Sequence, residues 1–204
     1  MATYMLLLVL AIDPYLFGVN EAGEMMTLIL IVFFSTFLIP SFATFLMIQL
    51  DLAKSFTMED RMDRTGPLIA SGIFYLWVFW NLYSRADIPR IYVALTLGAT
   101  IGLFVVFFFN IFFKISAHMT GMGGWIAAII LMSSFQGYQY LLVNVTSDGG
   151  ATIITLFNVL AISFVVAGLV GAARLYLKAH KLDELVYGFI GGFASMMLAY
   201  IIII

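Results

Sequence analysis

The chain of 204 residues has no cysteine, only four prolines and two histidines, and only 10% of its residues are charged. Without cysteine, disulfides and thiolate metal sites are excluded. So few charges cannot cover a surface in water, because soluble domains are about a quarter charged. What is present instead is apolar, since 64% of the residues are hydrophobic. We therefore expect lipid to be the solvent around most of the chain.

Seven stretches are long enough to be considered as membrane helices, which need about 20 mainly apolar residues. The first is marginal, because Asp13-Pro14 interrupts it, and we expect a short or truncated first span without a signal peptide. Backbone groups in lipid must be satisfied within helices. The sequence thus predicts an all-α, polytopic transmembrane helix bundle of six or seven spans, with residues 1–204 forming a single domain. The stretches are 2–18, 27–50, 67–84, 91–113, 120–144, 151–173 and 184–204.

The ionisable side chains are distributed unevenly between the two ends of this bundle. Seven spans place the loops near 51–66, 114–119 and 174–183 on one face. The opposite face has only Arg85 and Arg90 as cations. The positive-inside rule alone can gather lysine and arginine on one side, but it does not require histidines or fixed spacings. The first face holds Lys54, Arg61, Arg64, Lys114, His118, Arg174, Lys178, His180 and Lys181.

The stretch "ARLYLKAHKLDE", residues 173–184, has the most informative spacing. His180 and Glu184 are four residues apart, so on a helix they share one face. A carboxylate there can hold the imidazole N–H and leave the other nitrogen free to attack. Arg174 lies six residues before His180, and a turn near Lys178 would be needed to bring them together. A solvated loop with helix-capping charges is the alternative interpretation.

Two further stretches lie on the same face. In "KISAHMTGMGG", residues 114–124, Ser116 and His118 stand where a span ends, and the glycines allow close approach of helices or a ligand. A histidine at a membrane surface can also be a simple interfacial side chain.

The third stretch, "KSFTMEDRMDRTGP" (residues 54–67), contains Lys54 and Arg61 at i and i+7, followed by Arg64. Three cations with this spacing can cradle an oxyanion, and arginine can grip phosphate with two hydrogen bonds. The alternative is a charged loop in which the cations are neutralised by their acidic neighbours Glu59, Asp60 and Asp63.

Together the three stretches resemble the type 2 phosphatidic acid phosphatase family, whose motifs are K-x6-R-P, P-S-G-H and S-R-x5-H-x3-D. The resemblance extends from about residue 50 to residue 192, and Gly188 stands where family members often have glycine. Met62, Ile115, Ala117 and Ala173 depart from the motifs, and Arg64 is an alternative to Arg61 in the first. The matching positions are Lys54 and Arg61, then Ser116 and His118, then Arg174 and His180, with Glu184 in place of aspartate.

The resemblance implies hydrolysis of a lipid phosphate or prenyl diphosphate through a phospho-histidine, without a metal or other cofactor. His180 would attack phosphorus, Glu184 would orient it, and His118 would protonate the leaving oxygen. The lipid tails would stay between the helices. The implied partners are the bilayer and a phosphorylated lipid, not a nucleic acid, and the expected place is a bacterial inner membrane. The count of all cations puts the site on the inner face, whereas the resemblance favours the outward face. The phosphoryl oxygens would be held by Lys54, Arg61 or Arg64, Ser116 and Arg174.

Two other functions remain open from the sequence. A descendant of the family that has lost catalysis would bind or transport a phospholipid. A membrane prenyltransferase would use Glu59 and Asp63 to hold magnesium and a prenyl diphosphate, because "RTGPLIASG" follows them.

Overall fold

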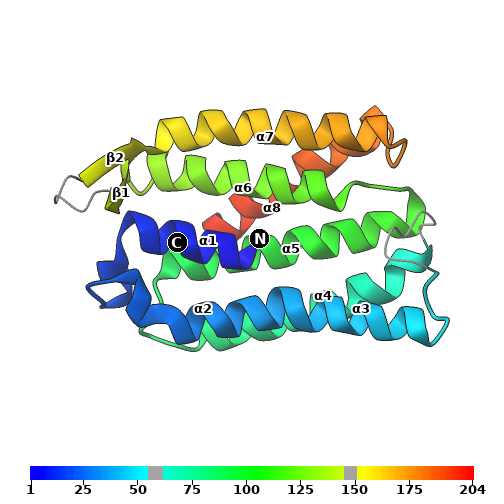
Figure 1. Ribbon diagram of the computed structural model, residues 1–204, viewed down its shortest axis with the longest axis horizontal. Coiled ribbons are helices and arrows are strands. Elements are labelled where there is room, and N and C mark those ends of the chain that lie inside the picture. Colours follow the sequence, from blue (N-terminus) through cyan, green and yellow to red (C-terminus); the bar gives the residue numbers. More distant parts are fainter. Residues whose placement is uncertain (55–61, 145–150) are drawn as a thin grey trace.

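The computed structural model describes residues 1–54, 62–144 and 151–204 and is built mainly from helices. Long helices lie side by side along one direction, and α8 lies behind α5 and α6 in the view of Figure 1. The helical prediction is therefore confirmed. The elements are α1 (Ala2–Ile12), η1 (Pro14–Phe17), η2 (Ala22–Met25), α2 (Met26–Phe33), η3 (Phe34–Leu38), α3 (Ile39–Gln49), η4 (Met62–Arg64), α4 (Thr65–Tyr83), α5 (Arg90–Phe112), α6 (Ala117–Ser134), β1 (Tyr140–Asn144), β2 (Ala151–Thr155), α7 (Leu156–Tyr176) and α8 (Leu182–Ile203).

Four helical segments of the described chain are long and apolar enough to cross a membrane. This is compatible with an integral membrane protein. The number is smaller than the six or seven spans expected from the sequence. The four segments are Gly23–Gln49, Arg90–Phe112, Leu156–Tyr176 and Leu182–Ile203.

The first predicted span, 2–18, is wrong in extent. The helix α1 stops at Ile12, and Asp13 turns the chain by accepting a hydrogen bond from the backbone N–H of Tyr15. Eleven residues are about 16 Å of helix, roughly half of what a bilayer requires. Seven of the eleven residues of α1 are buried, and the helix packs against α5, so α1 is a core element of the bundle.

The helix from Gly23 to Gln49 contains a wide turn in its middle. Residues 34–38 form the π-helical segment η3 immediately before Pro40. Proline has no N–H to donate to the preceding turn, and a π-bulge is one way in which a helix absorbs such a break. The hydroxyl of Thr36 donates to the carbonyl of Val32 within this region.

The predicted spans 120–144 and 151–173 are wrong where they meet. The helix α6 ends at Ser134, Gly137 adopts a positive φ of 75°, and β1 pairs with β2 in an antiparallel hairpin. Four of the five residues of β2 are β-branched, which favours extended backbone. The hairpin projects from one end of the bundle, opposite the end where α7 turns into α8 (Figure 1).

Candidate functional site

The helices α6 and α8 run parallel and touch backbone to backbone. A Cβ atom on Gly192 would lie 1.9 Å from the carbonyl oxygen of Thr120, and one on Gly123 would lie 2.0 Å from that of Phe189. A Cβ on Gly188 would meet the carbonyl of Ser116 at 2.6 Å. Glycine at these positions therefore permits an approach that any other residue would prevent. As a result, the first turns of α6 and α8 lie together at one end of the bundle.

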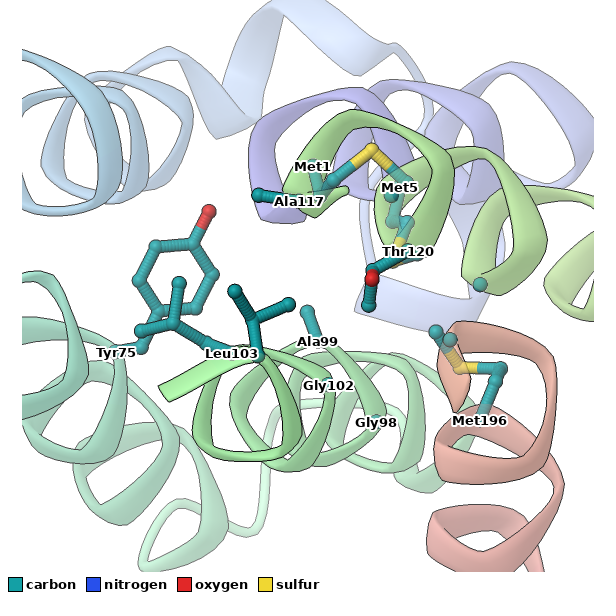
Figure 2. Close-up of a pocket in the computed structure, with 14 residues that line it drawn as sticks. Met1, Met5, Tyr75, Gly98, Ala99, Gly102, Leu103, Ala117, Thr120 and Met196 are labelled. Carbon is teal, nitrogen blue, oxygen red and sulfur yellow. The ribbon is translucent and has the colours of Figure 1, made fainter. Parts of the chain in front are cut away.

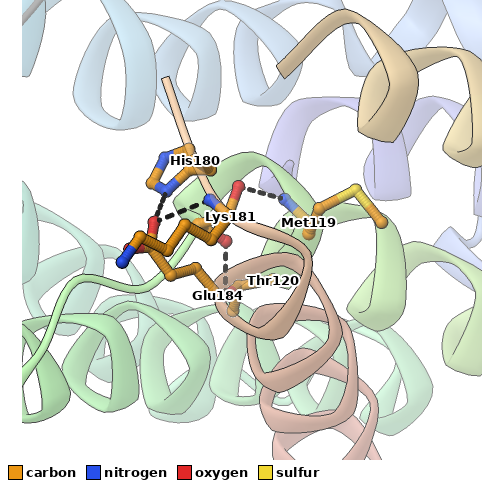
Figure 3. Close-up of polar contacts among 6 residues, drawn as sticks. Met119, Thr120, His180, Lys181 and Glu184 are labelled. Carbon is orange, nitrogen blue, oxygen red and sulfur yellow. Dashed lines mark hydrogen bonds and ion pairs between the residues drawn. The ribbon is translucent and has the colours of Figure 1, made fainter. Parts of the chain in front are cut away.

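His180 and Glu184 form the contact expected from their spacing. The Nδ1 atom of His180 donates to the carboxylate of Glu184 at 2.7 Å (Figure 3). The same carboxylate accepts the backbone N–H of Lys181 at 3.3 Å and so caps the start of α8. The side chain of His180 is only 4% exposed. Since a carboxylate only accepts, Nδ1 carries the hydrogen, and Nε2 of the neutral ring keeps its lone pair.

A tight turn at Lys178 brings His180 back toward the end of α7. Lys178 adopts a left-handed conformation with φ of 50°. The backbone N–H groups of Ala179 and His180 both point to the carbonyl of Arg174, at 3.0 and 3.4 Å. Together with the bond from Lys178 to Leu175, this is a Schellman cap. The turn that the sequence required near Lys178 is therefore present.

Ser116 ties the segment that carries His118 to the start of α8. Its backbone N–H donates to the carbonyl of Glu184 at 3.2 Å. Its hydroxyl is fully buried and accepts the backbone N–H of Met119 at 3.4 Å, which makes Ser116 the N-cap of α6. Its carbonyl accepts a hydrogen bond from the hydroxyl of Thr120 at 3.0 Å. Here Ser116 acts as a helix cap, and the phosphate contact expected for its hydroxyl stays a prediction.

Arg174 lies against His118. A guanidinium Nη2 of Arg174 is within hydrogen-bonding distance of Nε2 of His118. Arginine can only donate, so Nε2 of His118 is the acceptor and its ring hydrogen is on Nδ1. His118 is exposed and Arg174 is half-buried. The pair therefore stands at the accessible edge of the cluster, while His180 lies inside it.

Arg64 belongs to the same cluster. It is half-buried in η4, directly before α4, and it interacts electrostatically with Glu184, Arg174, His118 and His180. Burial lowers the pKa of Arg64, while Glu184 opposes that change. Of the two arginines that the sequence offered for the first motif, Arg64 is the one placed here. Arg61 lies outside the described residues.

Burial also lowers the pKa of the His180 imidazole below its ordinary 6.5. Its bond to Glu184 acts in the opposite direction, and Arg64 and Lys114 add to the lowering. His180 is therefore neutral at physiological pH, which is the form with a lone pair at Nε2.

Lys114 is a residue that sequence reasoning counted only as a loop cation. It is half-buried in the connection between α5 and α6 and acts on His180 electrostatically. Its position two residues before Ser116 was a signal that could have placed it in the site. Lys54 is exposed just beyond the end of α3, at the same end of the bundle.

Helix ends add to the positive potential around these side chains. The N-termini of α4, α6 and α8 all lie at this end, and each carries a partial positive charge. With Arg64, Lys114 and Arg174, they form an environment suited to an oxyanion such as phosphate. Among the described residues, Glu184 is the acidic side chain that forms a hydrogen bond with His180.

No group of three or more histidine, aspartate or glutamate side chains that could hold a metal is found in the described ranges. Asp63 lies in η4. Its expected magnesium-binding partner Glu59 falls outside those ranges, so the aspartate-rich pair is not described as a unit.

The bundle core contains an apolar cavity of about 80 Å³ between α1, α4, α5, α6 and α8 (Figure 2). Ala117 and Thr120 line its end nearest the cation cluster, and Met5 and Met196 lie deeper. Its volume is that of only two or three liquid water molecules. No charged side chain of the described chain lines it. The cavity is therefore neither the charged site nor large enough for a lipid tail.

Comparison of the chain with protein-family models, with curated proteins and with solved structures finds no match. The function of the chain is therefore inferred from the geometry of one cluster, which is formed by Arg64, Lys114, His118, Arg174, His180 and Glu184.

Proposed function

We propose that the protein hydrolyses a lipid phosphate monoester or a prenyl diphosphate through a phospho-histidine on His180. The observation that carries this proposal is the bond of Nδ1 of His180 to Glu184 at 2.7 Å. It directs the Nε2 lone pair of a neutral imidazole. Arg64 and Lys114 act electrostatically on this ring, and Arg174 and Arg64 act on His118. A nucleophile oriented by an acid and surrounded by phosphate-binding groups is the arrangement that phosphoryl transfer requires.

In the proposed first step, Nε2 of His180 forms a bond to phosphorus as the bond from phosphorus to the lipid oxygen breaks. Arg174 turns from His118 to the phosphoryl oxygens, together with Arg64 and Lys114, and stabilises the charge that develops there. Once Arg174 has left it, Nε2 of His118 takes up a proton from the solvent, and the resulting imidazolium gives that proton to the leaving oxygen. In the second step, water attacks the phosphorus, His118 takes a proton from that water, and the products are inorganic phosphate and neutral His180.

The membrane placement that fits this proposal has six crossings. The helices α4 and α6 contain 19 and 18 residues. These are about 28 and 27 Å long, close to the thickness of a bilayer core. We propose that these two helices and the four longer segments all cross the membrane, with the cluster at one membrane surface beside the lipid headgroups. We place the protein in a bacterial inner membrane with the site facing outward.

The test measures phosphate release by the purified protein in lipid nanodiscs from phosphatidic acid and from a prenyl diphosphate. We expect turnover that is insensitive to EDTA and is abolished in His180→Ala. Acid-labile, base-stable ³²P on the wild-type protein after a quench would identify the phospho-histidine. The matched control is Lys178→Gln, an exposed cation of the same loop, which should retain turnover. Full activity of His180→Ala would overturn the mechanism.

A second function is favoured by the way Ser116 and Arg174 are engaged. Ser116 is buried as a helix cap, and Arg174 donates to His118. A protein that binds or transports a lipid phosphate without cleaving it would have this arrangement. Saturable binding of phosphatidic acid without phosphate release would favour that function. A magnesium requirement with a prenylated product would instead favour a prenyltransferase using Glu59 and Asp63.

A further inference from the structure

A long apolar groove lies between α7 and α8 and ends at the cation cluster. Its volume is about 480 Å³. Phe164, Gly168 and Gly171 form the wall on α7, Leu185 and Phe189 form the wall on α8, and Met119 of α6 lies between them. None of the described residues that line the groove is charged.

The groove exists because α7 rests on α6 and stands apart from α8. A Cβ on Gly168 would meet no atom within 4 Å, so there is open space at that point. A Cβ on Gly171 would have only ordinary contacts with Met119 and Leu185, at 3.8 and 4.0 Å. Small residues on α7 therefore leave room that larger ones would fill.

The groove and the cluster are continuous through neighbouring residues. Met119 follows His118, Leu175 follows Arg174, and Leu185 follows Glu184, and all three line the groove. An anion held by Arg174 would therefore have the apolar groove directly beneath it. Charge at the mouth and hydrocarbon along the walls match a molecule with a phosphate head and an apolar tail.

The depth of the groove matches one leaflet of a bilayer. From Leu175 to Phe164 there are eleven residue steps along α7. At 1.5 Å a step this is about 16 Å, roughly half of the 30 Å hydrocarbon core. A hydrocarbon tail that begins at the membrane surface would reach the end of the groove at the bilayer centre.

We propose that one hydrocarbon tail of a lipid phosphate monoester lies in the groove between α7 and α8 while its phosphate is held by the cation cluster. This inference rests on the phosphate site of the proposed function, but it does not require hydrolysis. It also replaces the expectation that the tails stay between the helices of the core, where the cavity is far smaller.

Trp125 can report on the inner end of the groove. Its indole N–H donates to Ser163 of α7 at 2.9 Å, and Ser163 adjoins Phe164. The other tryptophans, Trp77 and Trp80, are exposed on α4. The variant Trp77→Phe/Trp80→Phe therefore leaves a single emitting tryptophan beside the groove, and a brominated lipid tail quenches it only at short range.

The experiment places this single-tryptophan protein in phosphatidylcholine nanodiscs that contain a few mole per cent of brominated phosphatidic acid or brominated phosphatidylcholine. We expect several-fold stronger quenching by the brominated phosphatidic acid. Gly168→Leu, which fills open space, should abolish the excess, and Gly168→Ala should retain it. Arg174→Gln should also remove the excess, because the phosphate is no longer held.

Equal quenching by the two brominated lipids, or an excess that survives Gly168→Leu, would overturn the inference. Thermal unfolding verifies that the Gly168 variants are folded. Phosphate release is measured on the same samples, so failure of hydrolysis is distinguished from failure of tail binding. Excess quenching without phosphate release would support the groove and contradict the hydrolytic function.

Discussion

Arg174 donates a hydrogen bond to His118 across fifty-six positions of sequence. The contact occupies the same guanidinium that a phosphate would require. It also occupies Nε2 of His118, so the ring hydrogen stands on Nδ1. A bound phosphate would compete for Arg174 through stronger, bidentate bonds and would release Nε2 of His118. We infer that ligand binding and exposure of this nitrogen occur together.

Arg174→Gln should weaken binding of a lipid phosphate. Hydrogen bonds to charged groups contribute about 1.5–3 kcal/mol each, which is roughly 10- to 100-fold in KM or in the dissociation constant. Arg174→Lys should recover only part of the loss, because an ammonium cannot make the paired contact. Titration with phosphatidic acid in nanodiscs measures the effect. Unchanged affinity in Arg174→Gln would remove Arg174 from the site.

Glu184→Gln should lower turnover by roughly 10²-fold, far more than Asp183→Asn does. Glu184 holds Nδ1 of His180, whereas Asp183 is exposed in the first turn of α8. Steady-state phosphate release from both variants provides the comparison. If the two variants ranked in the opposite order, Asp183 would be the functional acid and the third motif would be displaced by one residue.

The buried His180 should make the protein less stable in mild acid. Its pKa in the folded state is lowered, mainly by burial, so the unfolded chain binds more protons below about pH 6.5. The contribution of the neutral, buried His180 to the free energy of unfolding is present above that pH and is lost as the pH falls. Thermal unfolding from about pH 7.5 to about pH 5.5 should show a smaller fall in Tm for His180→Asn than for the wild type. An equal fall in both proteins would contradict this assignment.

Gly192→Ala should destabilise the contact between α6 and α8 by about 1–3 kcal/mol. The added Cβ would lie 1.9 Å from the carbonyl of Thr120, and a backbone group in a helix cannot move aside easily. Gly168→Ala is the matched control, because it adds the same methyl group to open space. Thermal unfolding measures both. Because this contact aligns His118 with His180, Gly192→Ala should also reduce turnover. Equal Tm values for Gly192→Ala and Gly168→Ala would contradict the close packing of α6 against α8.

Lys178→Gly should raise stability by about 1 kcal/mol, because a left-handed conformation is unfavourable for a residue with a Cβ. The Schellman cap of α7 uses only backbone groups at this position, so the turn should be preserved. The change should leave phosphate binding intact, since the Lys178 side chain is exposed. A lower Tm would indicate that the lysine side chain supports the turn.

The helices were predictable from the sequence where the length of an apolar stretch alone determines the secondary structure. The predicted spans 91–113 and 184–204 agree with α5 and α8 within two residues. The strands at 140–144 and 151–155 were not predictable in this way, because short apolar runs suit both a membrane helix and a strand. The deciding feature was Gly137, whose positive φ ends the helical course and allows the hairpin.

In the site, spacing within one segment was sufficient for His180 and Glu184, which a helix brings together whatever surrounds them. The contact of Arg174 with His118 depends on how three helices pack, and no local spacing encodes it. Lys114 is part of the cluster for the same reason. The hydroxyl of Ser116 illustrates the opposite case, since its residue type suggested a ligand contact and the fold uses it as a helix cap.

The parallel course of α6 and α8 has a consequence for transport between compartments. Both histidines stand at the same end of the bundle, and the described part of the opposite end carries the hairpin instead (Figure 1). In the proposed membrane placement, an anion that enters or leaves this cluster exchanges with the aqueous phase on one side alone. The orientation in which the chain inserts decides which compartment that is. The cluster therefore serves a single compartment, although no ligand has to cross the membrane through the protein.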